Sequence, residues 1–289
     1  MEPNEPTLQE EVAHDKVVVR SEVIIGGLVV AVVILGGVIW YMATHPAPAV
    51  PAPTDTATST TPGTTTTPTT LNESAAYYEI KAAYPLSTNL RASASASADA
   101  KAVEVMKQFE VNTIDGFKEQ GNFDHLTAED ITMLGFDKGR KESLDITYQG
   151  KTGAHTVSYL YTIVEDTLGA HPNTFFRAFT FDAKSGEGLD IGDIFAPGVN
   201  YLSILSMQSR KLLPATIAAR EGIKASGVDT AYIARGTTPD ADNFQTWYLE
   251  GSNMVIVFPP YQVAPYAAGA QTVTIPLAQI ATSVAAGYK

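Results

Sequence analysis

Hydrophobic and polar residues alternate, or form short apolar runs, in several segments of the C-terminal part of the chain. A period of two in stretches rich in β-branched and aromatic residues predicts β-strands. The predicted strands span residues 76–85, 143–149, 155–165, 174–183, 244–250, 253–260 and 271–280, and the last continues into a short helical turn. Several of the turns between them are short and contain glycine, which favours antiparallel hairpins because parallel strands need a long crossover.

Two longer segments have helical periodicity. Residues 99–119 repeat apolar residues at spacings near 3.6, and Asp99 or Ser97 is suited to cap the N-terminus. The repeating residues are Val103, Met106, Ile114 and Phe117, with Phe109 or Glu110 between them. Residues 199–221 form the second helix, which Pro214 is expected to kink or end. Two main helices with mostly antiparallel sheets predict an α+β fold.

The longest apolar run of the chain, VIIGGLVVAVVILGGVIWYM at residues 23–42, contains no charge. Twenty residues at helical rise reach about 30 Å, the thickness of a bilayer core. Lys16 and Arg20 precede the run, and no Lys or Arg follows it before Lys81. The positive-inside rule therefore predicts a cytoplasmic tail at 1–22, a transmembrane helix at 23–43 and an extracytoplasmic remainder at the cell membrane. A cleaved signal peptide is the alternative, but the tail carries six acidic residues, unlike a signal n-region.

Residues 44–73 consist largely of Thr, Pro and Ala. Such a composition buries too little apolar surface to offset chain entropy, so we expect a disordered linker. Beyond it, the composition becomes globular. We expect an N-terminal α+β subdomain at 74–150 and a C-terminal subdomain at 151–289, which together are long enough for a hydrophobic core.

Charge and cysteine content exclude several classes of function. The chain has a formal net charge of −12, and residues 74–289 carry 17 Lys+Arg against 23 Asp+Glu, a net charge of −6. Scattered lysines in an acidic chain do not form the basic face that nucleic-acid binding requires. The absence of cysteine excludes disulfides, thiolate metal sites and cysteine nucleophiles.

Two motifs in the C-terminal half resemble a known family. GAHPNTFFRAFTFDAKSGEGLDIGDIF (169–195) joins a Gly-Ala-His-Pro turn, a strand, a glycine turn and an Asp-Ile-Phe segment. FPPYQVAPYAAGAQTVTIP (258–276) joins a tyrosine, an Ala-Pro-Tyr turn and a strand that ends in Ile-Pro. At this spacing they resemble the RsiV-like extracytoplasmic domain, a bacterial family of unknown function. It occurs at the C-terminus of RsiV anti-sigma factors and beside the catalytic domain of PdaC-type peptidoglycan deacetylases.

The resemblance implies a cell-envelope surface module without catalysis, with lysozyme or a cell-wall component such as peptidoglycan as its ligand. It also suggests an anti-sigma-like signalling protein as an alternative. Only residues 1–22 are predicted to lie in the cytoplasm, and they carry little apolar surface with which to hold a sigma factor. We therefore expect a single-pass, monomeric ligand-binding or sensor protein that is not an enzyme and needs no cofactor.

His171 is the first candidate site residue. Gly169 and Pro172 beside it favour a tight turn, so the histidine either bonds the turn backbone, contacts a partner or acts as a catalytic base. The third option makes a cell-envelope hydrolase the alternative function, but the sequence has no G-x-S-x-G or H-E-x-x-H motif. A zinc site that combines His171 with His125 and His155 is formally possible.

Two tyrosines are the other candidates. Tyr261 and Tyr266 lie in the proline-bounded loop PPYQVAPYAAG, where aromatic rings either pack over the sheet or contact a ligand. Asp190 and Asp193, three residues apart, are a possible glycosidase pair, but capping of the turn around Gly192 explains them better. The sequence therefore predicts ligand binding by His171, Tyr261 and Tyr266, with no catalytic or metal-binding residue.

Overall fold

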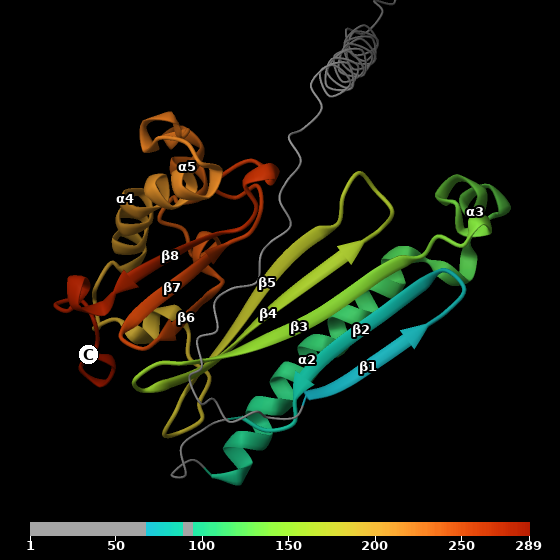
Figure 1. Ribbon diagram of the computed structural model, residues 1–289. Coiled ribbons are helices and arrows are strands. Elements are labelled where there is room, and N and C mark those ends of the chain that lie inside the picture. The colour runs from blue at the N-terminus through green and yellow to red at the C-terminus, as the bar shows by residue number, and fades with distance from the viewer. Residues whose placement is uncertain (1–67, 89–94) are drawn as a thin grey trace, which may run out of the picture. The chain divides into compact units, whose positions relative to one another are not determined.

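Two β-sheets organise the part of the chain that the computed structural model describes, residues 68–88 and 95–289 (Figure 1). The larger sheet has the strand order β1-β2-β3-β4-β5, and the smaller has the order β6-β7-β8. The strands of the larger sheet are β1 (Pro68–Ser74), β2 (Tyr78–Pro85), β3 (Glu142–Thr152), β4 (Thr156–Asp166) and β5 (Asn173–Asp182). Those of the smaller sheet are β6 (Trp247–Glu250), β7 (Asn253–Phe258) and β8 (Gln271–Pro276). The helices are α2 (Ala96–Gly121), α3 (Ala128–Leu134), α4 (Tyr201–Glu221) and α5 (Thr230–Gly236).

The predicted α+β class is confirmed, with one parallel strand pair in an otherwise antiparallel arrangement. β2 and β3 run parallel, from Tyr78 opposite Glu142 to Ala82 opposite Ile146. The chain between these strands includes α2 and α3, which gives the length that a parallel crossover needs. β3, β4 and β5 follow as antiparallel neighbours joined by short turns.

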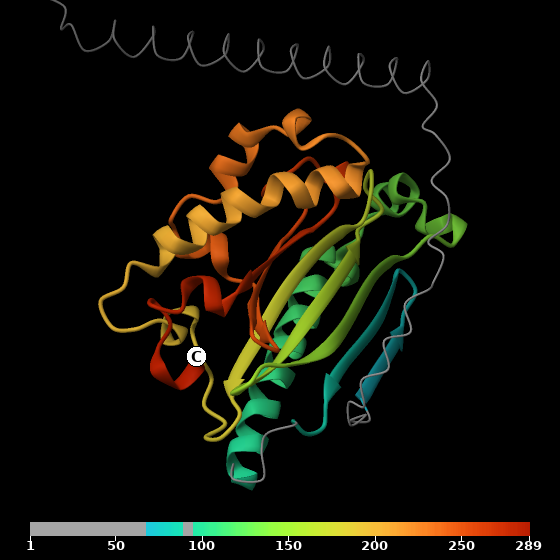
Figure 2. The ribbon, with the colours of Figure 1, turned by 60° about the vertical axis from the view of Figure 1, so that its left-hand side comes forward.

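The helix α2 covers one face of the five-stranded sheet (Figure 2). Its buried apolar residues recur at helical spacing and meet every second residue of the strands, as the periods of helix and strand require. This core includes Ala102, Met106, Ile114 and Phe117 of the helix with Ile80, Leu144, Ile146, Val157, Tyr159, Tyr161, Ile163 and Phe181 of the sheet.

The three-stranded sheet has a separate hydrophobic core on each face. Tyr248, Val255 and Val257 pack on the side of the larger sheet that faces away from α2, against Leu160 and Phe176. The alternate residues of the same strands pack with the apolar face of α4, and they include Trp247, Leu249, Met254, Ile256 and Phe258. The described chain is therefore layered as helix, five-stranded sheet, three-stranded sheet and helix (Figure 2).

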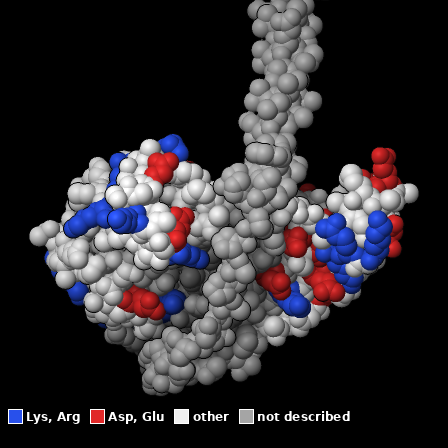
Figure 3. All heavy atoms as spheres, turned by 45° about the horizontal axis from the view of Figure 1, so that its top comes forward, with Lys and Arg blue, Asp and Glu red and all other residues white. Residues whose placement is uncertain are grey.

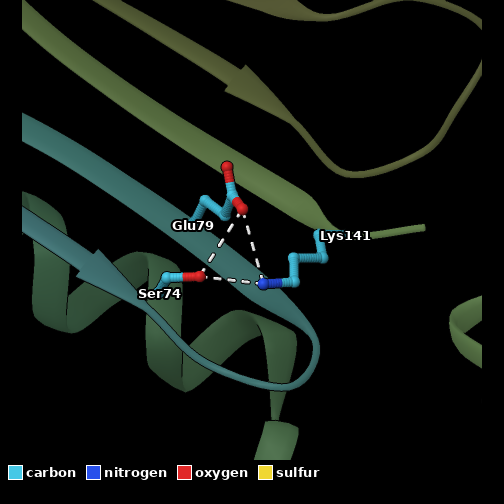
Figure 4. A network of polar contacts seen from close by, with 3 residues as sticks. All are labelled: Ser74, Glu79 and Lys141. Carbon is cyan, nitrogen blue, oxygen red and sulfur yellow. Dashed lines mark hydrogen bonds and ion pairs between the residues drawn. The ribbon is translucent and has the colours of Figure 1, made fainter. Parts of the chain in front are cut away.

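Basic and acidic side chains lie interspersed on the described face drawn in Figure 3. Among the described residues, three ion pairs join elements that are distant in sequence. Two of them link β1 or β2 to neighbouring elements. Lys118 on α2 lies 2.7 Å from Glu73 on β1 and lowers the pKa of that carboxyl. Lys141 donates to Ser74 (2.8 Å) and Glu79 (3.4 Å), which links β1, β2 and the start of β3 (Figure 4).

Three local predictions need correction. The expected linker at 44–73 overlaps β1, whose sequence PTTLNES lacks an apolar alternation but pairs along its whole length with β2. The helix expected at 99–119 begins at Ala96, with Ser95 rather than Ser97 or Asp99 as its N-cap. Pro214 does not end α4, which continues to Glu221 because residues on both sides of the proline, Leu213 and Ile217, are buried in the core.

The predicted subdomain boundary, between residues 150 and 151, falls inside a strand. The predicted membrane span falls outside the described residues. β3 runs through residues 150 and 151, and the chain passes from the larger to the smaller sheet between Asp182 and Trp247. The predicted tail, the transmembrane helix at 23–43 and most of the linker lie outside the described residues. None of the helices within 68–88 and 95–289 has the length and hydrophobicity that crossing a membrane would need.

Glu110 is a buried acid on the apolar face of α2. Glu110 is only 4% exposed, and its Oε2 atom has no hydrogen-bond partner among the described residues. The hydroxyl of Tyr161 on β4 is likewise buried without a partner there. Burial disfavours the carboxylate, which raises the pKa of Glu110 to about 7. The core beneath α2 therefore favours the neutral acid.

This burial makes the free energy of unfolding depend on pH. Because folding raises the pKa of Glu110 from 4.5 to about 7, its contribution is fully present below pH 4.5 and is lost as the pH rises through 7. We expect Glu110→Gln to stabilise the protein at pH 8 by up to about 3 kcal/mol, and to change stability much less at pH 4.5. Urea unfolding followed by circular dichroism at both pH values measures this, with Glu104→Gln on the exposed side of α2 as the control. Equal pH dependence in all three proteins would contradict the prediction.

Candidate functional site

The three residues predicted to bind a ligand come together where two loops meet. His171 lies in the loop between β4 and β5, and Tyr261 and Tyr266 lie in the loop between β7 and β8. The imidazole of His171 stacks on the ring of Tyr266, with centroids 3.7 Å apart and planes 17° apart. The rings of Tyr261 and Tyr266 lie 5.4 Å apart. We call these three residues the aromatic cluster.

Hydrogen bonds fix the orientation of the rings. The Nδ1 atom of His171 lies 3.1 Å from the carbonyl oxygen of Pro172, which can only accept, so Nδ1 donates. In the neutral imidazole, the Nε2 atom then accepts from the hydroxyl of Tyr261 at 3.2 Å. Tyr266 donates its hydroxyl to the same Pro172 carbonyl at 2.9 Å. Hydrogen bonds between the β4–β5 loop and the β7–β8 loop therefore orient the aromatic side chains of both.

The backbone of both loops is in an unusual conformation. Tyr261 has a φ of 71° and Leu168 has a φ of 61°, in the left-handed region that bulky residues rarely adopt. The Asp166 carboxylate accepts from the Leu168 N–H at 2.9 Å and so holds its turn. Tyr261 is nevertheless 55% exposed, so burial of its ring does not explain the strain. Such strain persists where surrounding structure enforces it, often at binding sites.

The chain next to Tyr261 is anchored in the core. Gln262 donates its amide to the carbonyls of Gly236 (3.0 Å) and Asn243 (2.9 Å), and Val263 and Ala264 are buried. The carbonyl of Gln262 lies so near Gly236 that a Cβ atom there would be 1.8 Å from it. The end of α5 and the loop therefore pack backbone to backbone, which positions the exposed tyrosine before any ligand binds.

The surroundings of His171 bear on the hydrolase alternative. Its hydrogen-bond partners among the described residues are the Pro172 carbonyl and the Tyr261 hydroxyl, and neither is a carboxylate that could orient a catalytic imidazole. Asp166, which is near in sequence, bonds the turn backbone instead. Among the described residues, His171 is thus held by groups of the two loops.

The structure also locates the Asp190–Asp193 pair and the three histidines, which the sequence offers as other candidate sites. The Asp193 carboxylate accepts from the N–H of Asp190 at 2.8 Å and caps the 3₁₀ turn Ile191–Ile194, as the capping interpretation predicts. His155 and His171 lie beyond opposite ends of β4, and His125 lies in the 3₁₀ turn Phe123–His125. Across residues 68–88 and 95–289, no group of three or more His, Asp or Glu side chains could hold a metal ion.

The sequence predicts the members of the aromatic cluster but does not indicate what positions them. The positive φ of Tyr261 and Leu168 has no signal in the sequence, because neither is a glycine or an asparagine. The contact between Gln262 and Gly236 joins residues 26 positions apart. In the sequence, Gly236 is the feature that indicates close packing, because glycine allows another backbone to approach.

Comparison with known proteins identifies a domain within the chain. Residues 192–278 match the family model DUF3298, described as a protein of unknown function. The chain therefore carries a DUF3298 domain, which contains the second motif, 258–276, and the end of the first. The resemblance inferred from those motifs is confirmed at the level of the family.

Two curated relatives match less than half of the chain. Over 122 residues it is 30% identical to the peptidoglycan-N-acetylmuramic acid deacetylase PdaC of Bacillus subtilis, a match covering 42% of this chain and 24% of that protein. Over 132 residues it is 23% identical to the esterase Rv3036c of Mycobacterium tuberculosis, covering 45% and 53%. The chain thus spans about a quarter and about half of their respective lengths.

Two solved structures of DUF3298-family proteins are similar to most of the chain. One from Bacteroides fragilis has a TM-score of 0.50 at 15% identity and covers 76% of this chain and 93% of its own. One from Pseudomonas aeruginosa has a TM-score of 0.45 at 10% identity and covers 78% and 97%. At such identities, the first likeness concerns the fold alone.

A pair of substitutions at Tyr261 tests the backbone strain. Both Tyr261→Gly and Tyr261→Val remove the ring, but only glycine tolerates a φ of 71° without cost. We expect the glycine variant to be more stable than the valine variant by about 1 kcal/mol or more. Urea unfolding measures the difference, and equal stabilities would show that the loop relaxes freely.

Proposed function

We propose that the protein is a membrane-anchored, extracytoplasmic ligand-binding or sensor protein without catalytic activity, and that the aromatic cluster is its contact surface. The observation that carries this proposal is the strained, exposed Tyr261 beside the stacked rings of His171 and Tyr266. Aromatic rings bury a large area at a low cost in conformational entropy. Rings that are already oriented bind with little further ordering.

The anchor and the linker support a role at the cell surface. An uncharged run at 23–42 followed by a stretch rich in Thr and Pro is the arrangement expected of a domain held away from a membrane. PdaC is named for a reaction on peptidoglycan, which makes the cell wall a reasonable setting for this chain as well. We therefore propose a location at the cell membrane with the DUF3298 domain outside.

We propose a basic protein such as lysozyme as the first ligand to test, and peptidoglycan as the second. Residues 74–289 carry a net charge of −6, and an opposite charge on a partner speeds encounter. Peptidoglycan offers no such charge complementarity. We propose peptidoglycan fragments as the second ligand because peptidoglycan belongs to the cell surface at which we place this protein.

Calorimetry on the full-length chain in lipid nanodiscs tests the contact surface. We expect lysozyme to bind, and His171→Ala and Tyr266→Ala each to weaken binding at least tenfold, because central aromatic contacts dominate interface energies. Met133→Ala, which changes an exposed apolar residue on α3, is the control and should bind as the wild type does. If lysozyme and peptidoglycan fragments both fail to bind, or if the cluster variants bind normally, the proposed contact surface is wrong.

A cell-envelope hydrolase that uses His171 is the second candidate, because the two curated relatives are named as a deacetylase and an esterase. Our proposal predicts that the protein and its His171→Ala variant hydrolyse p-nitrophenyl acetate at the same background rate. The assay requires only the full-length chain and an empty nanodisc as the blank. Turnover that the wild type shows and the variant lacks would favour the hydrolase over the binding protein.

A further inference from the structure

A pocket of about 200 Å³ lies far from the aromatic cluster. Its walls come from three segments: the β3–β4 turn with Ala154, the β6–β7 turn with Gly251 and Ser252, and the C-terminal segment 277–289. The β3–β4 turn precedes β4 and the loop that carries His171 follows it. The eleven residues of β4 therefore separate the two places by about 35 Å.

Backbone hydrogen bonds hold the walls in place. The N–H of Ala154 donates to the carbonyl of Gly251 at 3.2 Å, which joins the two turns. The N–H of Leu277 donates to the carbonyl of Ser252 at 2.9 Å, which ties the C-terminal segment to the β6–β7 turn. A third bond runs from the N–H of Ala285 to the carbonyl of Ile194 at 2.9 Å. The pocket is therefore formed before any occupant binds.

The lining is predominantly apolar. Leu249, Leu277 and Val284 contribute side chains that are otherwise buried, with exposures of 2%, 7% and 1%. Two small residues, Ala278 and Ala281, also line the pocket, and both are exposed. The hydroxyl of Tyr288, another lining residue, is bonded to Asp182 at 3.4 Å and so already has a partner.

We propose that this pocket binds a small uncharged apolar group, of the size of a single ring or a short acyl chain. Apolar groups predominate in the lining, although His155, Ser252 and Lys289 also border it. An apolar cavity of about 150 Å³ is large enough to bind benzene. The walls belong to turns of both sheets, so an occupant contacts both layers of the fold at once. The site is independent of the aromatic cluster and of the function proposed for it.

The absence of cysteine allows a direct test on the full-length chain. Ala281→Cys places one thiol at the pocket, and Ala219→Cys places one on the exposed side of α4 as the matched control. Each variant is equilibrated with excess 2-mercaptoethanol and with two disulfide reagents, one bearing a phenylethyl group and one bearing a carboxyethyl group. Intact mass spectrometry then gives the ratio of apolar to charged adduct at each position.

We expect this ratio to be at least tenfold higher at residue 281 than at residue 219. Adding Ala278→Leu to the Ala281→Cys variant fills the space and should reduce the ratio to the control value. Circular dichroism checks that each variant is folded. Equal ratios at the two positions, or a preference at residue 281 that survives Ala278→Leu, would overturn the proposal.

Discussion

The packing of the three-stranded sheet on the five-stranded sheet is the interaction on which the other features of this structure depend. Tyr248, Val255 and Val257 bury one face of the smaller sheet against Leu160 and Phe176. At the same contact, Thr180 on β5 bonds both Ser158 on β4 (3.0 Å) and the carbonyl of Trp247 on β6 (3.4 Å). A β-strand directs alternate side chains to opposite faces, so the same short strands also form the core beneath α4.

This packing brings together loops that are far apart along the chain. His171 and Tyr261 are separated by 90 positions, and each lies in a loop that leaves a different sheet. Loops carry recognition best when a rigid scaffold positions them. The paired sheets form that scaffold for the aromatic cluster at one end of β4. Beyond the other end of β4, the turns of the two sheets bond to each other and enclose the apolar pocket.

The core under α2 combines apolar packing with buried polar groups. It has a continuous apolar face, yet it buries Glu110 and the hydroxyl of Tyr161 without partners among the described residues. A buried, unsatisfied acid reduces stability unless it is neutral. At the outer edge of this sheet, β1 pairs along its length with β2, and the ion pair of Lys118 with Glu73 links β1 to the helix. The described chain thus combines a tightly packed two-sheet centre with a more polar periphery.

The sequence by itself determined the elements whose residues repeat with a clear period. The strands from β2 to β8 and the helices α2 and α4 follow from local apolar patterns, and the two family motifs pointed to the DUF3298 domain. Only the tertiary structure decided the parallel pairing of β2 with β3, the existence of β1 and the left-handed backbone of Tyr261. These features arise from contacts between distant residues, which local periodicity does not encode. The stacking of His171 on Tyr266 is the clearest case, because the sequence supplied both rings and the packing of the two sheets brought them together.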